Sequence, residues 1–385
     1  MPRSTAALLN MPLDQYRAMR AGQGVSFDPK FASWNVYRYD DVVRILDDNV
    51  TFSSERPVTP GQPGLPSIVG MDVPRHRKLR SLINQAFTPR SVEQLAPRIA
   101  EVAGGLIDKV LPRGEMDLMQ DFAYPLPITI IAELLGIPVE EQATFRRWSE
   151  TLISGPRTDA MRGRSYAQER SDNLRDLNDY FQRKLDERRA QPRQDLMSRL
   201  LAAEVDGERL SGNDLLEFCR LLLIAGYETT AYLVGSAALC LDEHPDVAAE
   251  LRADPSLLPA ALEEMFRCFP SVAGTMRLSR ADCEIAGTPI AAGQSLIVWI
   301  GSANYDEAHF ERPEELDIRR TPNRHIAFGR GIHFCVGAPL ARLEARIALS
   351  LLLERLPRLR RVRDRPLDAV ESPFIFGVRH FPATF

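Results

Sequence analysis

The feature that most constrains this chain is a glycine-punctuated loop that carries one cysteine to the start of a long helix. The loop runs from Phe328 to Pro339 and reads FGRGIHFCVGAP. Beyond it, apolar residues recur at helical spacing from Leu340 to Leu351, and a proline suits the first helical turn. Cys335 therefore precedes a helix N-terminus, where unpaired amides and the helix dipole favour a thiolate. The sequence predicts an anionic sulfur ligand, and the alternative is a small buried apolar side chain.

The composition is that of an ordinary globular protein. The chain has 385 residues, of which 44% are hydrophobic and 26% charged, and its net charge of −4 gives no sign of nucleic-acid binding. No linker rich in proline, glycine or serine divides it. We expect a single domain over 1–385, with an α-rich lobe at about 72–270 and β-containing regions at about 25–70 and 275–385.

Cysteine usage and the N-terminal sequence indicate a cytoplasmic protein. The five cysteines are widely spaced without a C-x-x-C pair, so neither a disulfide framework nor a zinc site is indicated. Residues 1–20 lack the charged-then-apolar pattern of a signal peptide. The longest apolar helix is interrupted by Arg220 and Glu228, so we expect no membrane anchor.

Hydrophobic periodicity predicts a mainly α fold with a minor β region. A strand is expected at 34–39, followed by a helix capped by Asp40, and the breakers at 56–70 indicate a long loop. A hairpin is expected at 284–290 and a strand at 295–300. The polar segment 154–163 would suit a hinge or an ordinary connection. The expected helices are at 91–110, 128–135, 140–153, 165–190, 195–203 and 212–242.

Two further clusters place polar side chains where a bound group could use them. His76 and Arg80 lie at i and i+4 on one helix face, although a solvated basic face would look the same. Glu228 and Thr229 follow Gly226 within an apolar helix, where burying them is costly without a function. The alternative for the second cluster is a kinked core helix in which the threonine hydroxyl bonds back to a carbonyl.

Together these motifs resemble the bacterial soluble cytochrome P-450 monooxygenases, whose cysteine loop reads F-x-x-G-x-H-x-C-x-G and whose haem is held by a cysteine thiolate. The resemblance implies the triangular haem-thiolate fold, with Cys335 as the iron ligand of haem b. It implies that Glu228 and Thr229 form the acid–alcohol pair that relays protons to dioxygen. The residues implied to contact haem are His76, Arg80, Ala225, Gly226, Arg277, Phe328, His333 and Gly337.

The resemblance also implies a scaffold and a substrate pocket. Glu264 and Arg267 match the E-x-x-R pair of the family, and Arg320 is expected to complete a buried structural network with them. The distal pocket is expected to include the 56–70 loop, the 154–163 segment and the apolar residues before Thr229. The individual side chains expected to line the pocket are Val272, Ala273, Phe374 and Ile375.

The function implied is oxygen insertion into an apolar small molecule, by hydroxylation or epoxidation, with dioxygen and external electrons. No dinucleotide-binding fingerprint is present, so the electrons of NAD(P)H are expected through a separate ferredoxin or flavodoxin and its reductase. We expect this partner to dock on a basic patch made by Arg75, Arg77, Lys78, Arg330 and Arg342. A peroxide-driven haem-thiolate peroxygenase and a non-catalytic haem-based sensor remain as alternatives.

Overall fold

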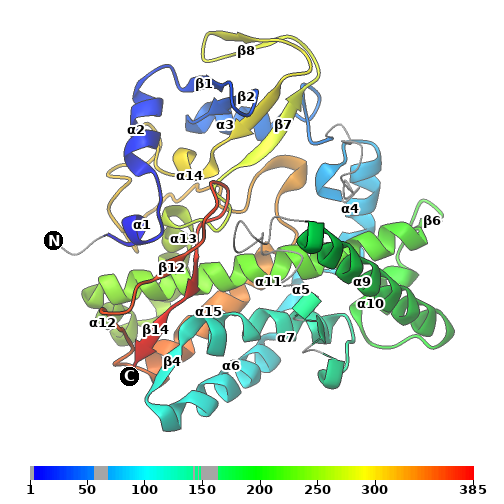
Figure 1. Ribbon diagram of the computed structural model, residues 1–385, viewed down its shortest axis with the longest axis vertical. Coiled ribbons are helices and arrows are strands. Elements are labelled where there is room, and N and C mark those ends of the chain that lie inside the picture. The colour runs from blue at the N-terminus through cyan, green and yellow to red at the C-terminus, as the bar shows by residue number, and fades with distance from the viewer. Residues whose placement is uncertain (1–3, 56–67, 142–143, 146, 149–163) are drawn as a thin grey trace.

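The computed structural model describes residues 4–55, 68–141, 144–145, 147–148 and 164–385. Figure 1 shows a broad helical base that tapers toward a smaller region rich in strands, which holds both the N-terminal and the late-middle strands. Most of the expected 56–70 loop and the whole 154–163 segment lie outside the described residues. Residues 68–70 form a short 3₁₀ turn.

The helices dominate the described chain, as the sequence predicts. The expected 91–110 helix is divided into α5 and α6, and the 128–135 helix begins earlier, at Pro125. The bounds are α1 Thr5–Leu8, α2 Leu13–Ala21, α3 Tyr39–Asp47, α4 Arg75–Ala86, α5 Pro89–Glu93, α6 Ala96–Val110, α7 Pro125–Leu134, α9 Arg164–Ala190, α10 Leu196–Ala202, α11 Gly212–Glu243, α12 Pro245–Ala253, α13 Leu258–Cys268, α14 Ile300–Ala303 and α15 Ala338–Arg355.

Helix α11 is the central element of the helical base (Figure 1). Ser211 and Asp214 form a capping box at its start, which satisfies two of the amide groups that a helix N-terminus leaves unpaired. The helix packs against α7, α9, α13 and α15. Among the described residues it alone is long and apolar enough to cross a membrane, but 61% of its apolar window is buried inside the protein. The apolar side chains of α11 therefore form part of the protein core.

The strands form one mixed sheet and several small ones. Apolar side chains at alternate positions of β2 and β10 pack in a second, smaller core with residues of α3. The main sheet has the order β1-β2-β10-β7-β3, and only β10 and β2 run parallel. The bounds are β1 Val25–Asp28, β2 Ser33–Val36, β3 Phe52–Ser53, β4 Glu115–Asp117, β5 Glu204–Val205, β6 Glu208–Arg209, β7 Thr275–Ser279, β8 Cys283–Ile285, β9 Thr288–Ile290, β10 Ser295–Val298, β11 Arg360–Arg361, β12 Asp368–Ala369, β13 Val378–His380 and β14 Pro382–Thr384.

The start of α3 differs from the prediction. The helix begins at Tyr39, so Asp40 stands in its first turn and does not cap it. The capping acceptor is Asp306, whose carboxylate accepts a hydrogen bond from the Tyr39 amide at 2.7 Å. A carboxylate supplied from 267 residues away performs the role that local sequence assigned to Asp40.

Candidate active site

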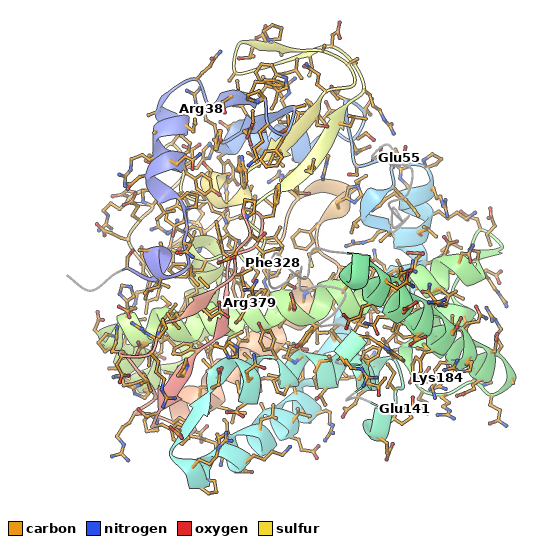
Figure 2. All side chains as sticks on the ribbon, in the orientation of Figure 1. Arg38, Glu55, Glu141, Lys184, Phe328 and Arg379 are labelled. Carbon is orange, nitrogen blue, oxygen red and sulfur yellow. The ribbon has the colours of Figure 1, made fainter. Side chains whose placement is uncertain are left out.

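The cysteine loop is held in place by its own backbone and by a close approach at one glycine. The Cys335 amide donates to the Phe328 carbonyl at 3.0 Å, and α15 begins three residues later, at Ala338. Gly331 has a φ of +66°, and a side chain there would come within 2.5 Å of the Leu46 carbonyl oxygen. The loop can thus lie against α3 only because this position is glycine. Figure 2 shows Phe328 close to the middle of the molecule.

The environment of the sulfur is mixed, because the amides of the helix start favour the thiolate whereas burial opposes it. Burial raises the pKa of the Cys335 thiol, while hydrogen bonds from the amides of Gly337 and Ala338 and the charge of Arg80 act to lower it. Burial has the larger effect on this pKa, and it depends on tertiary packing that the local sequence does not show. Among the five cysteines, all of them described, Cys335 is nevertheless the exposed one. Since a coordinating thiol is deprotonated by its metal, this sulfur suits a metal ion better than it suits free nucleophilic chemistry.

Two histidines from distant segments meet beside this loop. The ring centroids of His76, on α4, and His333 lie 4.3 Å apart. Nε2 of His333 lies 2.9 Å from the Ser54 hydroxyl, whereas Nδ1 of His76 is buried without a hydrogen-bond partner among the described residues. Burial, followed by the positive neighbours, lowers the pKa of His333 to about 3, and burial also lowers that of His76. Both rings are therefore neutral hydrogen-bonding groups at pH 7.

The two arginines of the expected haem contacts lie with these histidines. Burial lowers the pKa of Arg80, and the neighbouring Cys335 acts to raise it. Arg277, on β7, is buried and donates to the Met276 carbonyl at 2.8 Å. The charge of Arg277 and that of Arg80 both act on His333. The fold thus gathers His76, Arg80, Arg277 and His333 into one cluster of donors suited to carboxylates.

A buried carboxylate supports this cluster, and sequence reasoning did not single it out. Asp72 accepts hydrogen bonds from the Ser53 hydroxyl and from the Ser54 amide, and it forms an ion pair with Arg280 at 2.6 Å. Ser54 in turn contacts His333. The position of Asp72 four residues before His76 was a visible signal, but the two serines and Arg280 come from segments that no local pattern connects to it.

The middle of α11 presents small and polar groups rather than apolar side chains. Ala225 is exposed although the surrounding helix lies in the core, and Gly226 packs so closely on Ile131 that a Cβ would come within 2.7 Å of the isoleucine. The Thr229 hydroxyl donates to the Ala225 carbonyl at 2.6 Å. This is the bond that the kinked-helix alternative requires, but α11 continues without a break. Because the hydroxyl hydrogen is occupied, the lone pairs of Thr229 remain as acceptors.

The expected pocket residues form a paired strip that touches α11 at Thr229. Val272 and Ile375 make an antiparallel bridge, and the Ser271 hydroxyl donates to the Thr229 carbonyl at 2.7 Å. The ring of Phe374 stacks on that of Trp299 with centroids 5.4 Å apart. Ala273 is a correction to the predicted lining, because it is fully buried beneath this strip and has no surface to offer a ligand.

The expected scaffold residues are in contact. Arg267 and Glu264, both on α13 and both fully buried, form a bidentate pair with N–O distances of 2.8 Å, and Arg320 joins the same carboxylate at 3.0 Å. Arg267 also donates to the carbonyl of Asn304 at 2.8 Å. This network ties α13 to the segment that leads into the cysteine loop.

The expected basic docking patch is largely neutralised within the chain. Arg342 pairs with Glu263 at 2.7 Å and lies over the ring of Phe328, and the hydrogen bonds of His325 and Arg342 outweigh burial and lower the pKa of Glu263 to about 2. The remaining pairs are Arg75–Asp214, Lys78–Glu208 and Arg330–Asp47. Four of the five cations are thus ion-paired, so the patch is less positive than predicted.

These residues fit a haem. A cysteine that receives amide hydrogen bonds would serve as the iron ligand, and Nδ1 of His76 is a buried donor or acceptor in need of a partner. Exposed Ala225 presents only a methyl group on α11, which suits the face of a flat group. Cationic and neutral donors next to the cysteine loop suit the two propionates of a haem.

Comparisons with known proteins agree with this fit. The family model described as Cytochrome P450 matches residues 31–366. The crystal structure of CYP109B1 from Bacillus subtilis has a TM-score of 0.89 and 42% identity, covering 97% of this chain and 99% of that one. The structure of CYP109E1 from Bacillus megaterium in complex with corticosterone has a TM-score of 0.91 and 35% identity, covering 98% and 99%.

A third relative carries a reaction in its name. The cyclomarin C epoxidase CymV of Salinispora arenicola is 40% identical over 361 residues, which is 91% of this chain and 90% of the relative. Together with the cysteine loop, the donor cluster and the shared fold, these matches identify the chain as a haem-iron oxidoreductase. It belongs to the cytochrome P450 family of monooxygenases.

Proposed function

We propose that this protein inserts one oxygen atom of dioxygen into an apolar small molecule, by hydroxylation or epoxidation, with electrons from NAD(P)H delivered by a separate ferredoxin or flavodoxin and its reductase. The cofactor proposed is haem b, and a cytoplasmic location is proposed with it. The single observation that carries the proposal is the acid–alcohol pair Glu228 and Thr229 in the middle of the core helix α11. A haem protein that only senses a ligand has no need of a proton relay.

The residues proposed to hold the cofactor are those of the cysteine loop and the donor cluster. Cys335 is the proposed iron ligand, and the amides of Gly337 and Ala338 would spread part of its negative charge. The propionates are assigned to His76, Arg80, Arg277 and His333, with Phe328, Gly337, Ala225 and Gly226 contacting the ring. When bound, the haem supplies the activation of dioxygen, which the side chains of the protein cannot perform.

The chain's own contribution to the chemistry is the handling of protons and water. Thr229 presents lone pairs because its hydrogen is given to Ala225, so it can accept a hydrogen bond from a group above the helix. Glu228, the residue before it, can give up a proton from one carboxyl oxygen and regain a proton at the other. Partly exposed Val272, Phe374 and Ile375 line the proposed substrate side and keep water away from it.

The substrate class proposed is an apolar small molecule. The support is the apolar strip at Val272, Phe374 and Ile375, together with relatives named for a steroid complex and for an epoxidase. A panel of steroids, macrolactones and fatty acids, read by the change in the haem's visible spectrum, would identify the ligand. A panel without any spectral response would argue for the sensor alternative.

The decisive experiment on the reaction is Thr229→Ala. With a reductase system and a substrate from the panel, the variant should still consume NAD(P)H but release more hydrogen peroxide, with product formation reduced about 100-fold. Peroxide-supported turnover should fall less, because peroxide arrives already reduced and protonated. Equal product per NAD(P)H in both proteins would contradict the dioxygen mechanism. A wild type that turns over with peroxide but not with the reductase system would favour the peroxygenase.

A further inference from the structure

Two buried tyrosines, Tyr232 and Tyr124, lie next to Glu228 and to one another. Tyr232 stands one turn later on α11, and its hydroxyl donates to Oε2 of Glu228 at 3.3 Å. Tyr124, which precedes α7, meets the ring of Tyr232 edge-on with centroids 6.0 Å apart, and its hydroxyl interacts with that of Tyr232. Both residues are at most 6% exposed. The two hydroxyls therefore lie in a row that leads to Glu228, and the last of them donates to its carboxylate.

Neighbouring elements hold this chain in one geometry. Gly377 lies against the ring of Tyr232, where a Cβ would come within 2.5 Å, and Tyr124 packs on Tyr227 with ring centroids 5.5 Å apart. The next strand, β13, carries Arg379, and it contacts both α11 and the π-helical turn Met119–Ala123 that precedes Tyr124. Figure 2 shows Arg379 beside α11. The tyrosines are thus fixed between the central helix and the C-terminal strands.

The electrostatics suit hydroxyls that pass protons while staying neutral. Burial raises the pKa of Tyr124 and of Tyr232 above the usual value, whereas the charge of Arg379 acts to lower both. Neither tyrosine therefore carries a resting charge, and Arg379 reduces the cost of a transient negative charge on either oxygen. A hydrogen-bonded chain of this kind is strengthened by the low dielectric around it.

We propose that Tyr124 and Tyr232 form the supply end of a proton path to Glu228. This inference rests on the proposed function, because it assigns the source of the protons that the Glu228–Thr229 pair would use. When Glu228 gives up its proton, the O–H bond of Tyr232 breaks and one forms at Oε2 of Glu228. Tyr124 then donates its proton to the Tyr232 oxygen and takes one from water. Each hydroxyl gains one proton and loses one, and no electron moves.

The experiment removes each hydroxyl without removing its ring. Tyr232→Phe and Tyr124→Phe are compared with the wild-type holoenzyme for product formed per NAD(P)H consumed and for the solvent deuterium isotope effect on product formation. The matched control is Tyr180→Phe on α9, since the Tyr180 hydroxyl also donates to a glutamate, Glu141. Figure 2 shows Glu141 and its neighbour Lys184 away from Arg379.

A second measurement reports on the chain without turnover. In protein labelled with ¹³C at the ζ carbon of tyrosine, Glu228→Gln should shift the Tyr232 resonance and Tyr232→Phe should shift that of Tyr124. Tyr180→Phe should leave both unchanged. Haem content and thermal stability of each variant establish that it is folded.

The expected result is a loss of coupling of about fivefold to tenfold in both tyrosine variants, with an altered isotope effect, and wild-type values in Tyr180→Phe. Unchanged coupling in an active Tyr124→Phe protein, or tyrosine resonances indifferent to Glu228→Gln, would overturn the path. If only Tyr232→Phe lost coupling and the isotope effect stayed unchanged, Tyr232 would merely position Glu228. That result would also overturn the proton path. A wild type without dioxygen-dependent product would instead overturn the proposed function itself.

Discussion

The two sides of the active site are built in opposite ways. On the cysteine side, the chemistry lies in one continuous stretch, the loop from Phe328 to Gly337 and the start of α15. On the α11 side, Thr229 is reached by Ser271 from 42 residues away, and the strip it belongs to is closed by Ile375 from the C-terminal region. The first side is a local motif, whereas the second is a product of tertiary packing.

This difference explains what the sequence could predict. The cysteine loop, the helix behind it and the acid–alcohol pair are set by local spacing, and so are most of the helix positions. The hydroxyl chain through Tyr124, the support of Asp72 by Arg280 and the burial of Ala273 depend on which distant segments meet. Tyr232 could have been found from its i+4 spacing to Glu228, but Tyr124 is 108 residues from Tyr232 and carries no such signal.

The largest expected effect tests the cysteine side of the active site. Cys335→His should abolish the strongly red-shifted Soret band of the reduced carbon monoxide complex, because that band depends on a thiolate ligand. Cys283→Ser is the control, since this cysteine is also accessible but lies on the β8 strand. A red-shifted band that survives Cys335→His would falsify the assignment of the sulfur.

The next effect concerns the scaffold that carries the loop. Arg267→Met should lower the free energy of unfolding by about 3 kcal/mol, because it leaves the buried Glu264 carboxylate with fewer partners. Arg312→Met breaks an exposed pair of the same i, i+3 spacing, with Glu315, and should cost less than about 1 kcal/mol. Denaturant unfolding measures the free energy of unfolding of both variants. Equal losses would show that burial does not determine the contribution of these ion pairs to stability.

The pH dependence of stability should reveal a buried acid on α15. Glu344 has a side-chain oxygen without a hydrogen-bond partner among the described residues, and burial raises the pKa of its carboxyl to about 8. Between pH 4.5 and 8 the unfolded chain releases this proton while the folded protein keeps it, so stability falls as pH rises. The wild type should lose on the order of 5 kcal/mol of stability across this range, and Glu344→Gln should not show this loss.

The exposed Glu354 on the same helix provides the control for that measurement. Glu354→Gln should leave the pH profile of unfolding as it is in the wild type. A wild-type profile that is flat from pH 5 to 8, or one unaffected by Glu344→Gln, would show that the Glu344 carboxyl is solvated or paired in solution.

The smallest expected effect tests the α11 side of the active site, and it sharpens the comparison between the two sides most. Ser271→Ala removes the hydroxyl that ties the Val272–Ile375 strip to the Thr229 carbonyl, and should cost about 1 kcal/mol of stability. Ser279→Ala removes another buried serine hydroxyl, which donates to the Ala291 carbonyl at 2.6 Å and accepts from the Gln294 amide at 3.0 Å, and it should cost at least as much. Only Ser271→Ala should also change the ratio of oxidised products and the substrate-induced change in the haem spectrum, because only this strip faces the proposed substrate. If both variants lose stability equally and neither alters the product ratio, the strip is a structural support and the substrate-facing surface lies elsewhere along α11.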